Sequence, residues 1–443
     1  MTAALAEGAA EEGVEHKRRR VVLLLNNPFV ADSRSWKLAR SLGAAGRSVV
    51  VVARSGEGLP RDEEREGFHV VRLDQPQPLA WLPTPRLPEA ATGDPGRQLG
   101  SVVARVRASA IEIVGRPVQA LRYLRLASQW ADRIAEAVPG ADIWQAEGMI
   151  TLPVALALRR RFGGRVVYDA RDLQVESSRF ARLPGPWRRL LAWRERDWAR
   201  AADATITANQ PYADVLLRTL GLRSTVVFNG PLSPTAEGEP RSIDQAIPVR
   251  DRLAIPSSMR IVLYLGTVAP GRGVEQLCRA MVDVPDATLL VVGPGGAFRE
   301  RLRAEAAALP AADRIRFLPG VPPEEIPDWT AAADVAAMAI QPTTLNHRLT
   351  TPTRLFDALG AGVPVVASDL PGMAAIVRET GAGVLCDPTD PASIAGALRV
   401  VLDAPAERRQ AFHEAALAAG RGPYAWDRQV ERLLAVYRDL ASG

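Results

Sequence analysis

Residues 346–386 read NHRLTTPTRLFDALGAGVPVVASDLPGMAAIVRETGAGVLC, an order that is typical of an α/β sheet. A helix that carries Arg354 and Asp357 leads into a glycine turn, and an apolar strand follows over 363–367. A short loop then opens a second helix at Pro371. This order brings backbone N–H groups to a phosphate at the carboxyl edge of a sheet, and a nearby carboxylate can hold a ribose. The stretch therefore predicts a phosphate-and-ribose site.

The same alternation of strand and helix extends along most of the chain. In the first half, strand-like apolar runs cover 21–25, 48–53, 69–73, 141–146, 165–170, 204–208 and 224–228. In the second half they cover 260–266, 287–293, 314–318, 334–339 and 363–368. Near-continuous apolar strands between helix-length amphipathic segments indicate parallel sheets that helices cover on both faces. The predicted fold class is α/β.

Length and linker composition predict the division into domains. A chain of 443 residues favours two domains of roughly 200 residues each. The polar stretch GPLSPTAEGEPRSIDQAIP separates the two sets of strands. Proline-rich residues 75–99 predict a long surface loop within the first domain. In chain order we predict a disordered tail 1–19, a first domain 20–230, a linker 231–252, a second domain 253–422 and a final helix 423–443.

Composition favours a globular protein of the cytoplasm. Apolar residues make up 47% of the chain and charged residues 24%. Cys278 and Cys386, the only cysteines, form neither a disulfide framework nor a metal-binding spacing. No apolar run approaches the ~18 residues that span a bilayer. The start of the chain lacks the apolar segment of a signal peptide.

The net charge of +5 comes almost wholly from arginine, because Lys17 and Lys37 are the only lysines. Such an excess fits a nucleic acid, an anionic membrane or a phosphorylated substrate, and it also fits a bias in composition. No zinc-finger or RNP-like pattern accompanies the charge, so we expect no nucleic-acid partner. Residues 100–137 predict a basic helix that could lie on an anionic membrane or form an ordinary helix with a solvated face. Its arginines are Arg105, Arg107, Arg116, Arg122 and Arg125.

Two further glycine turns follow strands of the second domain. In YLGTVAPGRGVEQLCRAM, Gly266 follows a strand, and Gly271 and Arg272 precede a helix. Glycines let the backbone approach a diphosphate closely, and a guanidinium neutralises the oxygens of the diphosphate. The turn VVGPGG contains Gly293 but lacks the complete G-x-G-x-x-G pattern. Because the carboxyl ends of parallel strands meet at one crevice, we expect these turns and the loop after 368 to converge.

The stretches YLGTVAPGRG and NHRLTTPTRLFDALGAGVPVVASDLPGM resemble the nucleotide-binding signatures of retaining GT-B glycosyltransferases of the GT4 type. They are most similar to the branch with a YxGxxxxxRG loop and a PxKLFEYxxAGxPVVAS segment. Four parts of the first domain agree, namely DSRSWKLARSLGAAGRSVVVVA, DIWQAEGMITL, VVYDARDLQVE, and ADATITANQ with VVFNGP. The resemblance covers most of residues 20–440. It implies two Rossmann-like domains that face a central cleft, with the last helix crossing back onto the first domain.

The resemblance implies a donor site on the second domain. Arg272 would contact the diphosphate of the donor, and Arg354, where the family usually has Lys, would be the second phosphate cation. Asp357, where the family usually has Glu, would accept hydrogen bonds from the ribose hydroxyls. The other donor-side candidates are Gly266, Gly271, Gly293 and His347, with the backbone at Leu370, Gly372 and Met373.

On the acceptor side, the candidates are Asn27, Glu147, Arg171 and Asp172. Glu147 and Arg171, like Gln145, stand where relatives usually have histidine. Glu147 could act as a base, bind a sugar hydroxyl or bind a cationic acceptor, and these alternatives stay open. The catalytic candidates are Glu147, Arg272 and Arg354.

Chemistry without a metal ion is expected, because the chain contains no D-x-D motif. Thr350 also stands where the wider family often has the first of two glutamates. The resemblance implies a retaining transfer of a sugar from a nucleotide diphosphate to a hydroxyl acceptor in glycan, glycolipid or natural-product biosynthesis, without a cofactor. A UDP-sugar is the favoured donor, and GDP- and dTDP-sugars stay open. The alternatives are a GT-B-type sugar-nucleotide epimerase, which would recruit Glu147 and Asp172, and a catalytically inactive glycosyltransferase-like partner.

Overall fold

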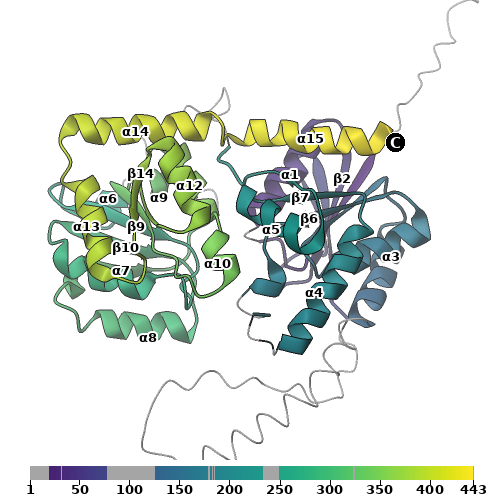
Figure 1. Cartoon of the computed structure of the whole chain (residues 1–443), viewed down its shortest axis with the longest axis horizontal. Helices are drawn as coiled ribbons and strands as arrows, with labels where there is room; N and C mark the ends of the chain where they lie inside the picture. Colours follow the sequence, from purple (N-terminus) through teal and green to yellow (C-terminus); the bar gives the residue numbers. More distant parts are fainter. Residues whose placement is uncertain are drawn as a thin grey trace, which may run out of the picture.

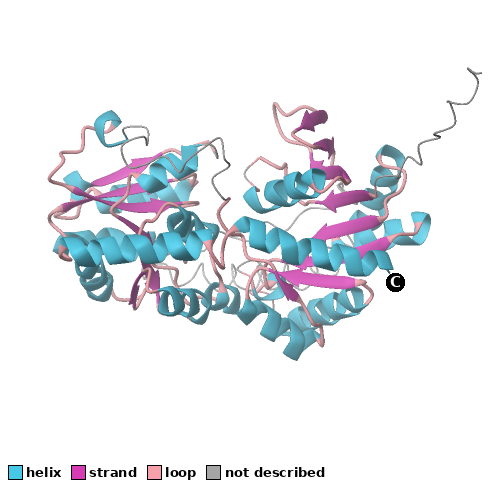
Figure 2. Cartoon of the chain, turned by 90° about the horizontal axis from the view of Figure 1, so that it is seen from above, coloured by secondary structure: helices cyan, strands magenta, loops and turns pink. Residues whose placement is uncertain are grey.

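The computed structural model describes residues 19–30, 32–76, 125–177, 180–181, 183, 185–232, 249–322 and 325–442. Two α/β domains lie side by side (Figure 1), and each consists of a sheet with helices on both faces (Figure 2). Most of the predicted tail, of the 75–99 loop and of the basic segment 100–137 lies outside the described residues. The same holds for residues 233–248 of the predicted linker.

The first domain contains an eight-stranded sheet in the order β3-β4-β2-β1-β5-β6-β7-β8. Its strands are β1 (Arg20–Leu24), β2 (Ser48–Arg54), β3 (Asp62–Arg65), β4 (Phe68–Leu73), β5 (Ile143–Glu147), β6 (Arg165–Ala170), β7 (Ala204–Thr207) and β8 (Thr225–Val226). All neighbours are parallel except β3 and β4, which form an antiparallel pair. The sequence pattern does not predict β3, because its residues DEER form a polar strand at the sheet edge.

The second domain contains a six-stranded sheet, entirely parallel, in the order β11-β10-β9-β12-β13-β14. Its strands are β9 (Arg260–Leu265), β10 (Ala287–Val292), β11 (Ile315–Leu318), β12 (Val335–Met338), β13 (Val365–Ser368) and β14 (Gly383–Cys386). Every residue of β10 is buried, as expected for a strand with helices on both faces.

The helices of the first domain are α1 (Ser33–Ala44), residues 125–137, α3 (Leu152–Phe162), α4 (Gly185–Arg200) and α5 (Gln210–Leu220). Those that follow are α6 (Val249–Arg252), α7 (Val274–Ala280), α8 (Ala297–Ala306), α9 (Ile326–Ala331), α10 (Leu345–Leu349), α11 (Thr353–Gly360), α12 (Pro371–Thr380), α13 (Pro391–Leu402), α14 (Ala406–Arg421) and α15 (Trp426–Ser442). Short 3-10 turns occupy Gln174–Glu176, Met281–Asp283 and Ala312–Arg314. Among the helices of the described residues, none is both long enough and apolar enough to cross a bilayer.

The strand order gives each sheet one switch point, where loops leave neighbouring strands in opposite directions. In the first sheet this point lies between β1 and β5, and in the second sheet between β9 and β12. Ligands of open parallel sheets bind at such points, outside the carboxyl ends of the strands. The loops after these four strands contain Asn27, Gly148, Arg272 and Thr343, so the predicted candidates Asn27 and Arg272 lie beside the switch points.

The last two helices run almost end to end over the top of the molecule, α14 over the second domain and α15 over the first (Figure 1). In α15, Trp426, Leu433 and Tyr437 are buried within the core of the first domain. The Trp426 indole donates to Ser41 Oγ at 2.9 Å, and Lys37 Nζ lies 5.0 Å from the centre of the ring. The end of the chain therefore completes the core of the domain that begins it.

We expect Trp426→Ala to lower the free energy of unfolding by about 3–5 kcal/mol, because it opens a large cavity at a residue only 1% exposed. Urea unfolding followed by circular dichroism measures this cost. Trp193→Ala is the matched control, since Trp193 is 56% exposed and should cost less than about 1 kcal/mol. Equal costs for the two variants would contradict the packing of α15.

Candidate functional site

Glycines bring the strand ends of the second sheet into direct contact. Gly293 has a φ of 155°, and a Cβ atom there would lie 2.0 Å from Gly266 O. Gly273 has a φ of 77°, and a Cβ atom there would lie 1.7 Å from Ala339 O. Larger residues do not fit at either position. The loops after β9, β10 and β12 therefore meet at one place, and the first two are turns that the sequence predicts to converge.

Arg354 lies at this meeting point, on the first turn of α11. Its guanidinium carbon stands 4.6 Å from the centre of the Tyr264 ring, and Nη1 donates to Leu265 O at 3.1 Å. A Cβ atom on Gly266 would come within 2.7 Å of Nη1, so this glycine makes room for the guanidinium. The Nε and Nη2 atoms are buried and have no hydrogen-bond partner in the described structure. Arg354 is thus a positioned cation with two unused donors.

Arg272 is a second positive charge beside Arg354. It is half-buried in the loop after β9, where burial and then the charge of Arg354 lower its pKa. Within the described residues, no carboxylate lies at ion-pair distance from either guanidinium. Two adjacent cations without a counter-ion repel each other, and an anion placed between them relieves that repulsion.

Asp357 follows Arg354 by one helical turn on α11. Burial raises the pKa of its carboxyl to about 6, and the charges of Lys37 and Arg354 oppose this rise. No group of the described structure donates a hydrogen bond to this carboxylate, so both oxygens are available to a ligand. Lys37 reaches the region from α1, where Nζ donates to Gly230 O at 2.6 Å, and burial lowers its pKa to about 8.

At the start of α12, the backbone N–H groups are more available to a ligand than the side chains are. Met373 has no exposed surface, and a Cβ atom on Gly372 would lie 2.3 Å from Leu349 O. Leu370 is the residue before the helix, and no side chain of the described residues caps its first turn. Only the N–H groups of this turn can face an anion.

His347 supports the glycine loop that carries Arg272. Its Nδ1 atom lies 2.7 Å from Thr343 Oγ1. A Cβ atom on Gly271 would lie 3.0 Å from both His347 Cε1 and Thr343 Oγ1, so the two side chains pack directly on the loop. Burial, and after it the charge of Arg272, lowers the pKa of His347 and favours the neutral ring.

Arg171 and Asp32 form the charged pair of the first domain. The two nitrogens Nη1 and Nη2 each lie 2.9 Å from one oxygen of Asp32. Burial acts to raise the pKa of Asp32, but the charge and hydrogen bonds of Arg171 lower it to about 2. Asn27 Nδ2 also donates to Asp32, at 2.7 Å. Asn27 therefore helps to hold Asp32 in place, and Asp32 compensates the charge of Arg171.

Glu147 is buried beneath Arg171 with no exposed side-chain surface. Its Oε1 atom accepts a hydrogen bond from Gln145 Nε2 at 2.6 Å, while Oε2 lies 3.7 Å from Arg171 Nη2 without forming one. Burial, reinforced by the charge of Asp169, raises the pKa of Glu147 to about 8. Gln145 in turn accepts a hydrogen bond from Tyr437 of α15. Burial therefore favours the neutral form of the Glu147 carboxyl, and Gln145 links this carboxyl to Tyr437 of α15.

Asp172 lies at the boundary between the domains. Asn346 Nδ2 donates to its Oδ1 at 3.2 Å, and burial raises the pKa of Asp172. The sequence pattern does not select Asn346, Asp32 or Lys37 as site residues. Signals exist for the last two, because Asp32 opens the stretch DSRSWKLARSLGAAGRSVVVVA, which carries part of the family resemblance, and Lys37 is one of only two lysines.

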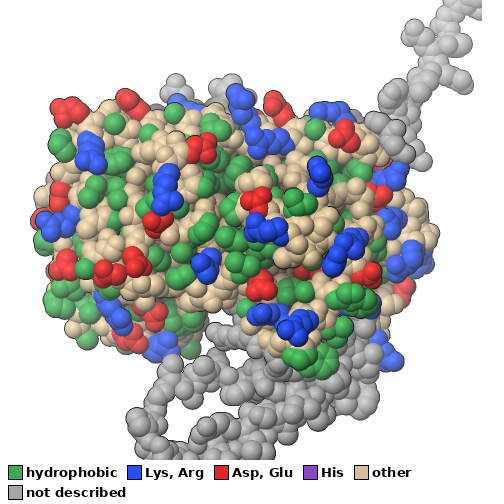
Figure 3. Space-filling view, viewed as in Figure 1, with side chains coloured by type: hydrophobic (Ala, Val, Ile, Leu, Met, Phe, Trp, Pro, Cys, Tyr) green, Lys and Arg blue, Asp and Glu red, His purple; other side chains and the backbone are tan. Residues whose placement is uncertain are grey.

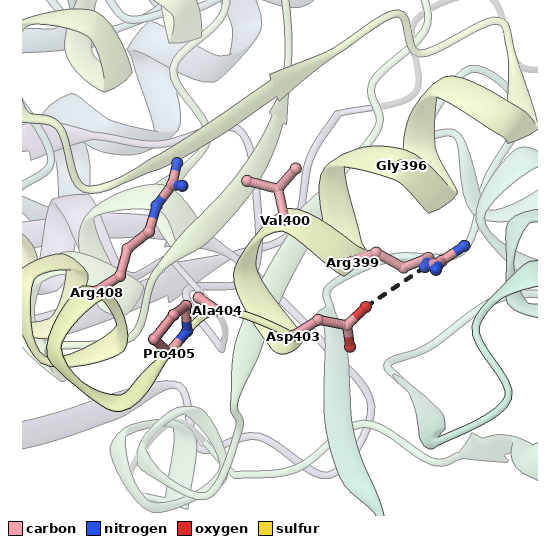
Figure 4. A pocket seen from close by; sticks show the side chains of 7 residues that line it. All are labelled: Gly396, Arg399, Val400, Asp403, Ala404, Pro405 and Arg408. Atoms are coloured by element: carbon pink, nitrogen blue, oxygen red, sulfur yellow. Dashed lines mark hydrogen bonds and ion pairs between the residues drawn. The ribbon is translucent and has the colours of Figure 1, made fainter.

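Over the face shown in Figure 3, acidic and basic side chains are interspersed on both domains. A hollow of about 430 Å³ lies between α13 and α14, away from the strand ends, and Figure 4 shows its ion pair between Arg399 and Asp403. This pair is exposed, and an exposed ion pair stabilises little.

Two Rossmann-like domains, with two arginines at one switch point that pair with no carboxylate of the described residues, define the chain as a two-domain GT-B protein. Residues 247–418 match the family model described as Glycosyl transferases group 1. A D-inositol 3-phosphate glycosyltransferase of Acidothermus cellulolyticus is 30% identical over 316 residues, which cover 67% of this chain and 67% of that protein. The chain belongs to the glycosyl transferases group 1 family and is a glycosyltransferase. Seven further relatives of that name match over 43 to 66% of their own lengths.

Solved structures agree on the fold. Sucrose-phosphate synthase from Thermosynechococcus elongatus superposes with a TM-score of 0.68 at 20% identity, covering 96% of this chain and 100% of that chain. The Anabaena protein HepE, solved with UDP and glucose, superposes with a TM-score of 0.65 at 15% identity, covering 95% and 100%. The predicted α/β fold of GT-B type is confirmed.

The buried carboxyl of Glu147 makes stability depend on pH. Its folded-state pKa of about 8 lies above the ordinary 4.5, so its contribution is complete below pH 4.5 and is lost as pH rises to about 8. Glu147→Gln keeps the size and removes the titration. We expect the melting temperature of this variant, relative to wild type, to rise by roughly 2–4 °C between about pH 5.5 and pH 8.5.

Differential scanning calorimetry at both pH values measures this shift. Asp132→Asn is the control, because Asp132 is 67% exposed and its difference from wild type should not change with pH. If the melting-temperature difference between Glu147→Gln and wild type were also the same at both pH values, Glu147 would be ionised in the folded protein.

Proposed function

We propose that this protein is a retaining glycosyltransferase that needs no metal ion and transfers a sugar from a UDP-sugar to a hydroxyl group of an acceptor. One observation carries the proposal. Arg272 and Arg354 are adjacent cations without a carboxylate partner in the described structure, and Arg354 Nε and Nη2 are buried without a hydrogen bond. A diphosphate supplies both the missing charge and the missing acceptors.

The donor would lie along the carboxyl edge of the second sheet. Arg272 and Arg354 would bind the diphosphate, and the first turn of α12 would add N–H groups. Asp357 would accept hydrogen bonds from the ribose hydroxyls, because its carboxylate has no donor from the described protein. UDP is our proposed nucleotide, in line with the ligand of the HepE structure and with the resemblance to the GT4 type.

The two arginines would also stabilise the departing diphosphate. As the bond between sugar and phosphate breaks, negative charge develops on the leaving oxygen, and preorganised cations stabilise that charge most. The acceptor hydroxyl would attack from the side that the diphosphate leaves, which retains the anomeric configuration. The leaving phosphate would accept the proton of that hydroxyl. No step requires Glu147, whose carboxyl is buried.

The acceptor would lie against the first domain, near Asn27, Arg171 and Asp172. Asp32 already compensates the charge of Arg171, so the acceptor side offers hydrogen-bonding groups more than net charge. This arrangement suits a hydroxyl-bearing acceptor. We also propose a cytoplasmic location, where the buried free thiols of Cys278 and Cys386 are ordinary.

We expect UDP to bind the wild-type protein and Arg354→Met to weaken that binding roughly tenfold to hundredfold, because charge-assisted hydrogen bonds are lost. Isothermal titration calorimetry measures the affinity. Arg399→Met is the matched control, since Arg399 is 61% exposed on α13 and should bind UDP like wild type. If UDP, GDP and dTDP all leave the melting temperature of the wild type unchanged at millimolar concentration, the donor site is refuted.

The ribose contact predicts a pH dependence. Asp357 has a raised pKa of about 6, so its ionised form, the stronger hydrogen-bond acceptor, is lost as pH falls through 6. We expect the affinity for uridine, which carries no phosphate, to fall about fivefold between pH 7.5 and pH 5. Saturation-transfer NMR measures this affinity. Asp357→Asn should bind uridine weakly and without pH dependence, and a pH-dependent Asp357→Asn variant would contradict the assignment.

A further inference from the structure

Asn346 on α10 belongs to the second domain but forms its hydrogen bonds with the first. Its Oδ1 atom accepts from Leu173 N at 2.8 Å, and its Nδ2 atom donates to Asp172 Oδ1 at 3.2 Å. Its backbone oxygen accepts from the phenol of Tyr212 at 3.2 Å. Asn346 is only 8% exposed, so these bonds are shielded from water. One amide therefore fixes the backbone that follows Arg171.

A second contact between the domains lies at the other end of α10. Asn209 Nδ2 donates to Leu349 O at 3.0 Å and to Thr351 Oγ1 at 3.1 Å. Asn209 separately caps α5 through its Oδ1 atom, and the contact with Leu349 and Thr351 touches neither the acceptor-side candidates nor the loop that carries Arg272. It provides a matched reference, because it crosses the same boundary without reaching the segment 171–173.

His347, the residue after Asn346, contacts a loop of its own domain. His347 and its partner Thr343 pack on Gly271, and Gln341 N donates to Gly271 O at 2.9 Å. Two consecutive residues of one short helix thus hold two different loops. Asn346 holds the acceptor-side loop after β6, and His347 holds the arginine loop after β9.

We propose that Asn346 is a positioning residue that couples the two halves of the site. Through Asn346 and His347, α10 transmits occupation of the arginine loop 271–273 to the acceptor-side segment 171–173. The inference rests on the proposed nucleotide site, because nucleotide binding is the event that is transmitted. A ligand that orders the arginine loop would then order the acceptor side as well, before any acceptor is present.

Loss of the Asn346 side chain should loosen the segment that follows Arg171 and leave the nucleotide site intact. Asn346→Ala leaves the Leu173 N–H and the buried Asp172 carboxyl without their partner, and an unsatisfied buried group favours local opening. The groups proposed to bind the nucleotide, Arg272, Arg354 and Asp357, make no hydrogen bond to Asn346. The Asn346→Ala variant should therefore bind the nucleotide as tightly as wild type, but nucleotide binding should no longer order segment 171–173 of the first domain.

Hydrogen exchange followed by mass spectrometry tests the coupling with UDP as the probe. In the wild type, saturating UDP should slow exchange at residues 170–177 at least tenfold. Asn346→Ala should bind UDP within about threefold of wild type, yet its exchange at 170–177 should change less than twofold. Thr351→Val, which removes one bond of the reference contact, should respond like wild type.

The outcomes separate this inference from the proposed function. If UDP does not bind the wild type, the nucleotide site is wrong. If UDP binds and Asn346→Ala responds at 170–177 like wild type, or if Thr351→Val loses the response equally, the coupling through Asn346 is wrong. Should Asn346→Ala fail to fold, Asn346→Asp decides the matter, because it keeps the shape but sets a second carboxylate against Asp172. That variant should also lose the response, and a retained response would overturn the proposal.

Discussion

Two positive charges, Arg272 and Arg354, stand together at the edge of the second sheet, and no carboxylate of the described structure lies at ion-pair distance from either. Holding like charges in place costs free energy, and the surrounding fold supplies what holds them. Tyr264 lies under one guanidinium, Leu265 O fixes its orientation, and glycines let the strand-end loops close around both. The core of the second domain thus holds two like charges together, and an anionic ligand would relieve their repulsion.

In the first domain, by contrast, buried charged side chains lie against partners of opposite charge. Arg171 is matched by Asp32 through two hydrogen bonds, and Arg34 is matched by Asp169 at 2.8 Å in the interior. Burial raises the pKa of Glu147 and so favours its neutral form. Breaking any of these pairs would leave a buried charge alone, which is expensive. The second domain therefore presents cations without ion-pair partners, whereas the charges of the first domain are largely paired. The two sides of the site therefore suit groups of different charge.

Much of this arrangement can be predicted from the sequence, because it depends on local patterns. Apolar runs mark the strands except β3 and the short β14, and the glycines after β9 and β10 mark where backbones must touch. The charged edge strand β3 leaves no apolar run, so it is missed. The burial of Glu147 is also missed, since a carboxylate at a strand end is expected to face solvent. Asn346 lies inside the most informative stretch, but its partners, such as Leu173, are distant in sequence and depend on how the domains meet.

The return of the final helix has a mechanical consequence. The chain passes between the domains twice, and the two passages touch, since Trp426 N donates to Pro231 O at 2.8 Å. Phe228, Tyr424 and Phe356 pack around them, with ring centres 5.1 to 5.7 Å apart. Two adjoining connections at one place would act as a hinge with one axis, which would allow opening and closing but resist twisting and sliding. Domains held in this way would keep their alignment, and any closure would return the same residues of α10 to the same partners.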